Sequence, residues 1–104
     1  MFDSDAFHRN VWYLIGATRG GPLRASIMGE LMERPLNPNQ LAERLGVDYK
    51  TITHHLSVLK KHNWVTSGSE KYAELFYPAF TDEQNAIFRE ILAKIGKSIK
   101  KTKR

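Results

Sequence analysis

The sequence contains no cysteine among its 104 residues, and it has no long hydrophobic run. Without cysteine the chain cannot form a disulfide scaffold, a thiolate zinc site, an iron–sulfur cluster or a cysteine nucleophile. No apolar run approaches the roughly 18 residues of a membrane span, and the first residues lack the basic-then-apolar pattern of a secretory signal. We therefore expect an uncleaved, soluble, cytoplasmic protein without membrane contact.

The residue groupings that enzymes use are also missing. The sequence has no phosphate-binding glycine loop, no carboxylates clustered with histidine and no visible hydrolase triad. His55 and His62 share one predicted helix but lie two turns apart, roughly 10 Å, which is too far for one ion without another ligand. We predict that the protein is not an enzyme and binds neither a metal nor a cofactor.

The positive charge of the chain is concentrated at one end. Lysine and arginine number 16 against 11 acidic residues, a formal net charge of +5. Six of the basic residues, and no acid, lie between Lys94 and Arg104, so residues 1–93 carry 10 basic and 11 acidic side chains. The tail is either a solubilising helix end, where cations suit the helix dipole, or an arm that contacts phosphate.

Four helices are predicted before a change of pattern at Trp64. Helical spacing and capping signals indicate a first helix over 3–17, stopped by Gly20-Gly21-Pro22, and a second from 23 to Pro35. A third begins at Asn37, where Pro38 and Gln40 complete a capping box, and breaks at Gly46. Asp48 caps the fourth, which runs to His62 or Asn63 with Ile52, Leu56 and Leu59 inward and His55 near the edge.

A two-stranded hairpin and a last helix follow. β-branched and aromatic residues at 64–66 and 75–77 flank a polar stretch over 67–72, and Thr81 to Gln84 form a second capping box. This order predicts a mainly α fold with a small β-hairpin, a winged helix-turn-helix with N- and C-terminal dimerisation helices. We expect one domain over 1–104: the N-terminal helix 3–17, a core over 23–78, and a C-terminal helix 81–100 with the basic tail to 104.

Residues 39–65 resemble the ArsR-type winged-helix regulators. The block from Asp48 to Leu56, DYKTITHHL, is most similar to the archaeal branch of that group, as are residues 17–21 and the end of the wing at Phe76-Tyr77. The resemblance covers roughly residues 15–80. It implies a DNA-binding transcription regulator and a dimer built from the first and last helices. The Cys-Val-Cys-type metal motif and the last-helix histidines of the family are absent, so metal sensing is not implied.

The outward face of the fourth helix is the predicted DNA-reading surface. Residues near the start of such a helix meet base edges in the major groove. The polar side chains on this face are Tyr49, Lys50, Thr53, His54 and Ser57. By resemblance, the first four fall where the family places base-reading side chains; a solvated polar face is the alternative.

Further polar residues are weaker candidates for DNA backbone contact. Lys60 and Lys61 could touch phosphate or simply suit the helix C-terminus, and Gln40 could bond a phosphate, although capping is the simpler role. On the wing, Lys71 and Tyr72 could contact the backbone or minor groove, beside the unfavourable charge of Glu70. Arg19 and Arg24 are surface charges or phosphate clamps, with surface charge favoured.

The first and last helices carry more apolar residues than a small winged core needs. The predicted dimerisation residues are Phe7, Val11, Leu14, Ile15, Phe88, Ile91, Leu92 and Ile95. Leaving such a stripe wet is costly, so we predict a homodimer, with folding back onto the chain's own core as the alternative. A dimer would place two reading helices about one DNA turn apart on a pseudo-palindromic operator.

We therefore predict a sequence-specific regulator of transcription, a repressor that binds double-stranded DNA as a homodimer. The alternative is a winged-helix module for protein–protein contact in transcription or chromatin machinery, which the near-neutral charge of residues 1–93 leaves open. The sequence leaves the operator, the target genes and any small-molecule effector open.

Overall fold

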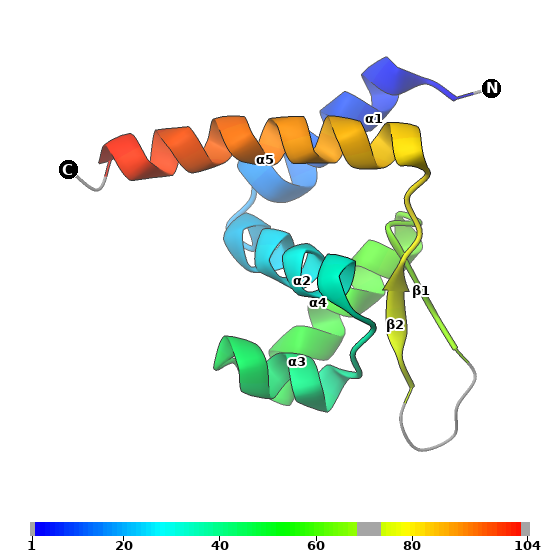
Figure 1. The fold of residues 1–104 in the computed structure, drawn as a ribbon. Coiled ribbons are helices and arrows are strands. Elements are labelled where there is room, and N and C mark those ends of the chain that lie inside the picture. Colours follow the sequence, from blue (N-terminus) through cyan, green and yellow to red (C-terminus); the bar gives the residue numbers. More distant parts are fainter. Residues whose placement is uncertain (1, 69–73, 103–104) are drawn as a thin grey trace. The chain divides into compact units, whose positions relative to one another are not determined.

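The computed structural model describes residues 2–68 and 74–102, and the side chains of these except 96–102 (Figure 1). The chain divides into two compact units. Unit 1 combines the two ends, residues 1–22 and 81–104, and unit 2 is the continuous segment 23–80. The single domain over 1–104 stays a prediction.

Unit 1 is helical. It contains α1 (Ser4–Val11), the π-helical turn η1 (Trp12–Gly16) and α5 (Asp82–Thr102), and α1 packs against α5 (Figure 1). Asp3 caps α1, since its carboxylate accepts the backbone N–H of Ala6 at 3.0 Å. At α5, the backbone N–H of Gln84 donates to the hydroxyl of Thr81 and Gln84 accepts in return, which confirms that capping box.

The predicted first helix changes geometry at Trp12. A π-helical turn widens the backbone over Trp12–Gly16, a feature that hydrophobic spacing does not indicate. Two glycines fit close contacts here. A Cβ on Gly16 would lie 2.8 Å from the ring of Trp12, and a Cβ on Gly21 would lie 1.9 Å from the carbonyl oxygen of Ile15. Only glycine fits position 21 without moving the backbone.

Most of the predicted dimerisation residues are buried within the single chain. Phe7, Val11, Leu14, Ile15, Phe88 and Ile91 are buried, and Leu92 and Ile95 are half-buried. A side chain that its own chain covers has no apolar surface left for a second copy. The six buried residues therefore serve the interior of the protomer, as the alternative interpretation had it. The large apolar side chains of this region that are exposed are instead Phe2, Trp12 and Tyr13, at 36%, 43% and 59% exposure.

Unit 2 holds the helix-turn-helix. It contains α2 (Gly21–Glu33, whose first two residues belong to unit 1), α3 (Pro38–Leu45) and α4 (Tyr49–Lys61), with α3 packed against α4. The predicted turn is confirmed, because Gly46 adopts the left-handed conformation with φ 66°. Asn63, also at positive φ (63°), follows the end of α4.

The hairpin forms one residue later than predicted. Strand β1 (Val65–Ser67) pairs antiparallel with β2 (Phe76–Pro78), with Thr66 opposite Tyr77. The backbone N–H of Phe76 also donates to the carbonyl of Leu36 at 2.9 Å, which joins the segment between α2 and α3 to the wing. Trp64, fully buried, packs edge-on against Phe80 at the base of the hairpin. In the part of the chain described, no helix has the length and hydropathy needed to cross a bilayer.

Candidate nucleic-acid interface

The candidate site is built on α4. Asp48 caps this helix, since its carboxylate accepts the backbone N–H of Thr51 at 3.1 Å and the Thr51 hydroxyl at 2.7 Å. These hydrogen bonds favour the ionised carboxylate and lower the pKa of Asp48. The capping carboxylate puts a negative charge at the helix start, where a phosphate would otherwise be attracted. The capped N-terminus of α4 is therefore a poor site for a phosphate group.

One face of α4 is anchored in unit 2. Ile52, Leu56 and Leu59 are buried, as the spacing predicts. His55 differs from the prediction, because it is only 8% exposed instead of lying at the edge. It is the one buried polar side chain found among the described residues.

The opposite face of α4 borders a hollow of about 220 Å³ beside the wing. Four of the predicted DNA-contacting residues line it together: Tyr49, Thr53, Ser57 and Lys60. The other walls come from Pro38 at the start of α3, from Leu56 and from Glu74 and Phe76 at the second strand. Lys50 and His54 are exposed on the same helix but do not line this hollow.

The hydroxyl groups on this face have a defined hydrogen-bonding state. Thr53 donates to the carbonyl of Lys50 at 3.0 Å, and Ser57 donates to the carbonyl of His54 at 2.7 Å. Each hydroxyl therefore donates its proton to a hydrogen bond within the helix, and its oxygen lone pairs remain available to accept hydrogen bonds. In this state Thr53 and Ser57 are acceptors suited to amino groups of adenine or cytosine.

The two predicted phosphate-binding lysines at the end of α4 are not equivalent. The ammonium of Lys60 donates to the hydroxyl of Ser67 on β1 at 2.8 Å, which links the helix to the wing. Lys61 is exposed at the last position of the helix.

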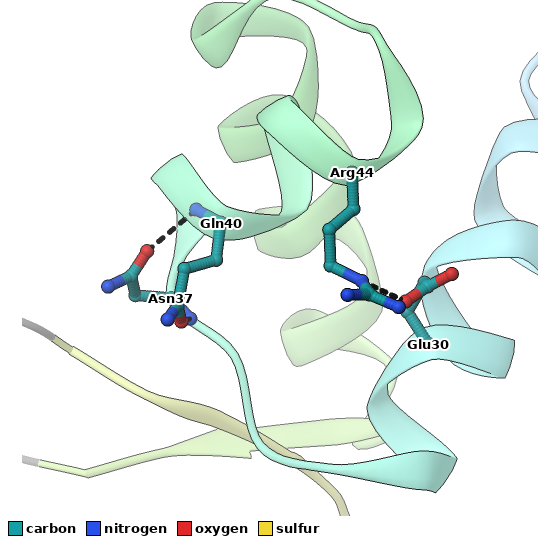
Figure 2. A network of polar contacts seen from close by, with 4 residues as sticks. All are labelled: Glu30, Asn37, Gln40 and Arg44. Atoms are coloured by element: carbon teal, nitrogen blue, oxygen red, sulfur yellow. Dashed lines mark hydrogen bonds and ion pairs between the residues drawn. The ribbon is translucent and has the colours of Figure 1, made fainter.

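Gln40 takes the capping role that its position indicates. Its side-chain oxygen accepts the backbone N–H of Asn37 at 2.9 Å, and its own N–H donates to the Asn37 side chain at 2.8 Å (Figure 2). The side-chain NH₂ group of Gln40 takes no part in these two bonds. Nearby, Arg44 on α3 forms an ion pair of 2.6 Å with Glu30 on α2 (Figure 2). Both partners are partly exposed, so the pair contributes about 0–1 kcal/mol.

The remaining predicted DNA contacts lie in residues that the structure does not describe. Lys71 and Tyr72 lie among residues 69–73, which the structure does not describe, and the same holds for the basic tail side chains beyond Lys94. Their roles stay predictions.

Two features of this site were missed from the sequence. Arg24, expected at the surface, donates from its Nε to Nδ1 of buried His55 at 3.2 Å. Glu74, to which the sequence assigned no role, adds a carboxylate to the wall of the hollow. Neither has a local sequence signal, because each contact joins segments far apart in the chain. Within residues 2–68 and 74–102, no group of three or more His, Asp or Glu side chains could hold a metal ion.

The segment that contains α4 is similar to a known protein family. Residues 21–67, from the start of α2 to the end of β1, match the family model described as bacterial regulatory protein, arsR family. A search of curated proteins gives no match.

Solved structures share the fold over most of the chain. HlyU from Vibrio cholerae superposes with a TM-score of 0.64 at 18% identity, covering 90% of this chain and 97% of its own. Rv0081 from M. tuberculosis gives 0.67 at 20% identity, covering 94% and 97%. The transcriptional repressor BigR from Xylella fastidiosa gives 0.66 at 16% identity, covering 88% and 89%.

At these identities the structural neighbours show the fold and no more. The matched family model describes regulatory proteins, and the fold is shared with the solved structures of HlyU and BigR. Residues 21–67 are thus similar in sequence to the arsR-family model, and the chain as a whole has a winged-helix fold.

Proposed function

We propose that this protein is a sequence-specific transcription regulator of the ArsR type, with α4 as the helix that reads DNA. The observation that carries the proposal is the exposed polar face of α4, where Tyr49, Thr53, Ser57 and Lys60 surround one hollow beside the wing. This face lies inside the family-matched segment. We assign the protein to the archaeal branch of the group from the block 48–56. Because a transcription regulator works where the DNA is, we propose a cytoplasmic location.

Each side chain of the face has a chemical role in this proposal. Tyr49, 51% exposed at the start of α4, and Lys50 beside it bring a hydroxyl and a cation to the base edges. Thr53 and Ser57 accept hydrogen bonds from base amino groups, and exposed His54 donates or accepts according to its tautomer. Lys61, the free donors of Lys60 and the NH₂ of Gln40 contact phosphate. Lys71, Tyr72 and the tail are proposed backbone contacts.

The protein acts as a homodimer in this account. Exposed Trp12 and Tyr13 lie on η1, and Trp12 borders a hollow of about 460 Å³ whose other walls include Ile15, Gly16 and Ile95. Two exposed aromatic side chains next to a mainly apolar hollow, which Thr18 and Arg19 also line, form a surface that a second copy can cover. Two copies would place two α4 helices about 34 Å apart on a pseudo-palindromic operator, where the bound dimer represses by occluding the promoter.

The oligomeric state has its own test. Sedimentation equilibrium of the full chain should show a dimer, and Tyr13→Glu should shift it to monomer. Tyr77→Glu, an exposed tyrosine on β2, makes the same charge change in unit 2 and should leave the dimer intact. A wild-type monomer at micromolar concentration, or equal effects of the two variants, would overturn this part of the proposal.

Base discrimination tests the reading face. The ratio of affinities for a selected duplex and its scrambled sequence should fall on Thr53→Val or Lys50→Ala, with a loss of about 1–3 kcal/mol for each good base contact. Lys94→Ala, outside the helix-turn-helix, should leave the ratio unchanged. If Thr53→Val and Lys50→Ala both keep the ratio, the assignment of α4 is wrong.

A protein–protein module is the second candidate. Residues 23–80 carry 7 basic and 6 acidic side chains, so unit 2 has little net charge to attract DNA. Weak, equal binding to all duplexes would favour this second function over the first.

A further inference from the structure

His55 carries a hydrogen bond whose direction determines its protonation state. The Nε of Arg24 on α2 lies 3.2 Å from Nδ1 of His55 on α4, and the imidazole is buried. A guanidinium only donates and does not lose its proton in proteins. Nδ1 must therefore supply a lone pair, which makes His55 a neutral imidazole with its proton on Nε2.

The contact joins α2 to the helix proposed to read DNA. Arg24 and His55 are 31 residues apart in sequence, so the bond acts between elements rather than within one. The charges acting on His55 are Arg24 on α2 and His54 on α4, and both, after burial itself, lower the pKa of His55. The neutral form that the geometry requires is thus the form that the surroundings favour.

His55 also contacts a residue of the DNA-reading face. The rings of His54 and His55 meet edge to face, with centroids 5.3 Å apart and planes at 63°. His54 is exposed. A fixed His55 ring therefore gives His54 a surface that restricts its orientation.

We propose that Arg24 is a positioning residue for DNA reading: it orients the buried ring of His55, and through that ring it orients His54. This rests on the proposed function of α4. Arg24 need not touch DNA in this role. A variant without the donor would keep the fold and still bind duplex DNA, but His54 would read bases with less precision.

The test separates positioning from simple charge loss. Arg24→Gln and the matched control Arg34→Gln, an exposed arginine at the end of α2, remove the same charge from unit 2. Arg24→Gln should lower the affinity ratio between a selected and a scrambled duplex by roughly tenfold, the scale of a hydrogen bond to a charged group. Arg34→Gln should keep the ratio, and Arg24→Lys should restore part of it.

A spectroscopic measurement without DNA completes the test. Nitrogen-15 NMR of the full chain at pH 7 should show His55 neutral, with Nδ1 unprotonated, and Arg24→Gln should change the Nδ1 signal. A proton on Nδ1 in the wild type would overturn the proposal even if Arg24→Gln unfolds. Equal ratios for Arg24→Gln and Arg34→Gln would overturn it while the proposed function stands. If the wild type shows no base preference, both the proposed function and the positioning role of Arg24 are contradicted. The NMR measurement would then still show whether Arg24 and His55 form the hydrogen bond.

Discussion

Lys60 and Ser67 connect α4, the helix proposed to read DNA, to the wing. The Nζ atom of Lys60, in the last turn of α4, donates to Oγ of Ser67 at the end of β1 over 2.8 Å. An ammonium carries three donors, so this bond leaves two for phosphate. Lys60 therefore orients the wing relative to α4 while remaining able to contact the DNA backbone.

A double-mutant cycle tests this connection. Ser67→Ala should weaken DNA binding by about 2- to 10-fold, because an exposed hydrogen bond of this kind contributes about 0.5–1.5 kcal/mol. In a Lys60→Met background, Ser67→Ala should have little further effect, as measured by fluorescence anisotropy. Lys61→Met, the control, should weaken binding to all duplexes alike and reduce the salt slope by about 0.9 for one lost phosphate contact, with no coupling to Ser67. Fully additive losses for Lys60 and Ser67 would show that the bond does not act in the complex.

Glu74 places a carboxylate beside the α4 face that is proposed to meet DNA. Glu74→Gln should raise the affinity for every duplex by about 2- to 5-fold at low salt, and the gain should shrink as salt screens the charge. Glu43→Gln, on an exposed site of α3 away from the hollow, is the matched control and should have a smaller effect. A loss of affinity confined to duplexes with one particular cytosine would instead show that Glu74 accepts from that base.

The burial of His55 makes stability depend on pH. Burial, then Arg24 and His54, lower the pKa of His55 from 6.5, so around and below that pH the unfolded chain binds more protons at this site than the folded chain. The free energy of unfolding should therefore fall as pH decreases from 7.5 to 5.5. Asp48, whose pKa is lowered from 3.8, contributes only in a more acidic range.

Urea midpoints at pH 7.5, 6.5 and 5.5 measure this effect. The decline of the wild-type midpoint should be larger than that of His55→Asn, while His62→Asn, at an exposed histidine, should decline like the wild type. An identical decline in His55→Asn would contradict the assigned role of His55.

Two glycines on α2 should respond in opposite directions to alanine. A Cβ at Gly21 would meet the backbone carbonyl of Ile15 at 1.9 Å, whereas a Cβ at Gly29 has nothing within 4 Å. Gly21→Ala should destabilise by about 2 kcal/mol or more, through a forced backbone shift. Gly29→Ala should stabilise by about 0.5–1 kcal/mol, because alanine is the better helix former. Thermal unfolding compares the two, and equal shifts of one sign would contradict the close contact.

Local signals in the sequence predicted the helix ends well. The capping pairs Asn37–Gln40 and Thr81–Gln84 and the left-handed turn at Gly46 occur as predicted, because each depends on residues within one turn of each other. The polar face of α4 followed from the same helical periodicity.

The sequence could not indicate contacts that depend on tertiary structure. The π-helical turn at Trp12–Gly16 has a composition that also suits an ordinary helix. The predicted dimer stripe included six side chains that are buried in the chain itself, because hydrophobic spacing is the same whether a second copy or the chain's own core covers the face. The Arg24–His55 bond and the position of Glu74 arise only when distant segments pack. Hydrophobic spacing thus predicted that these six side chains are buried, but not whether the same chain or a second copy buries them.

Selection of binding sites from a random duplex pool is the most direct test of the central claim that α4 reads DNA sequence. We expect an enriched pseudo-palindrome with half-sites about one helical turn apart. The protein should bind it ~10³-fold or more tightly than scrambled duplex at physiological salt, and Thr53→Val should reduce that preference. No enrichment, with weak and equal binding to all duplexes, would contradict it.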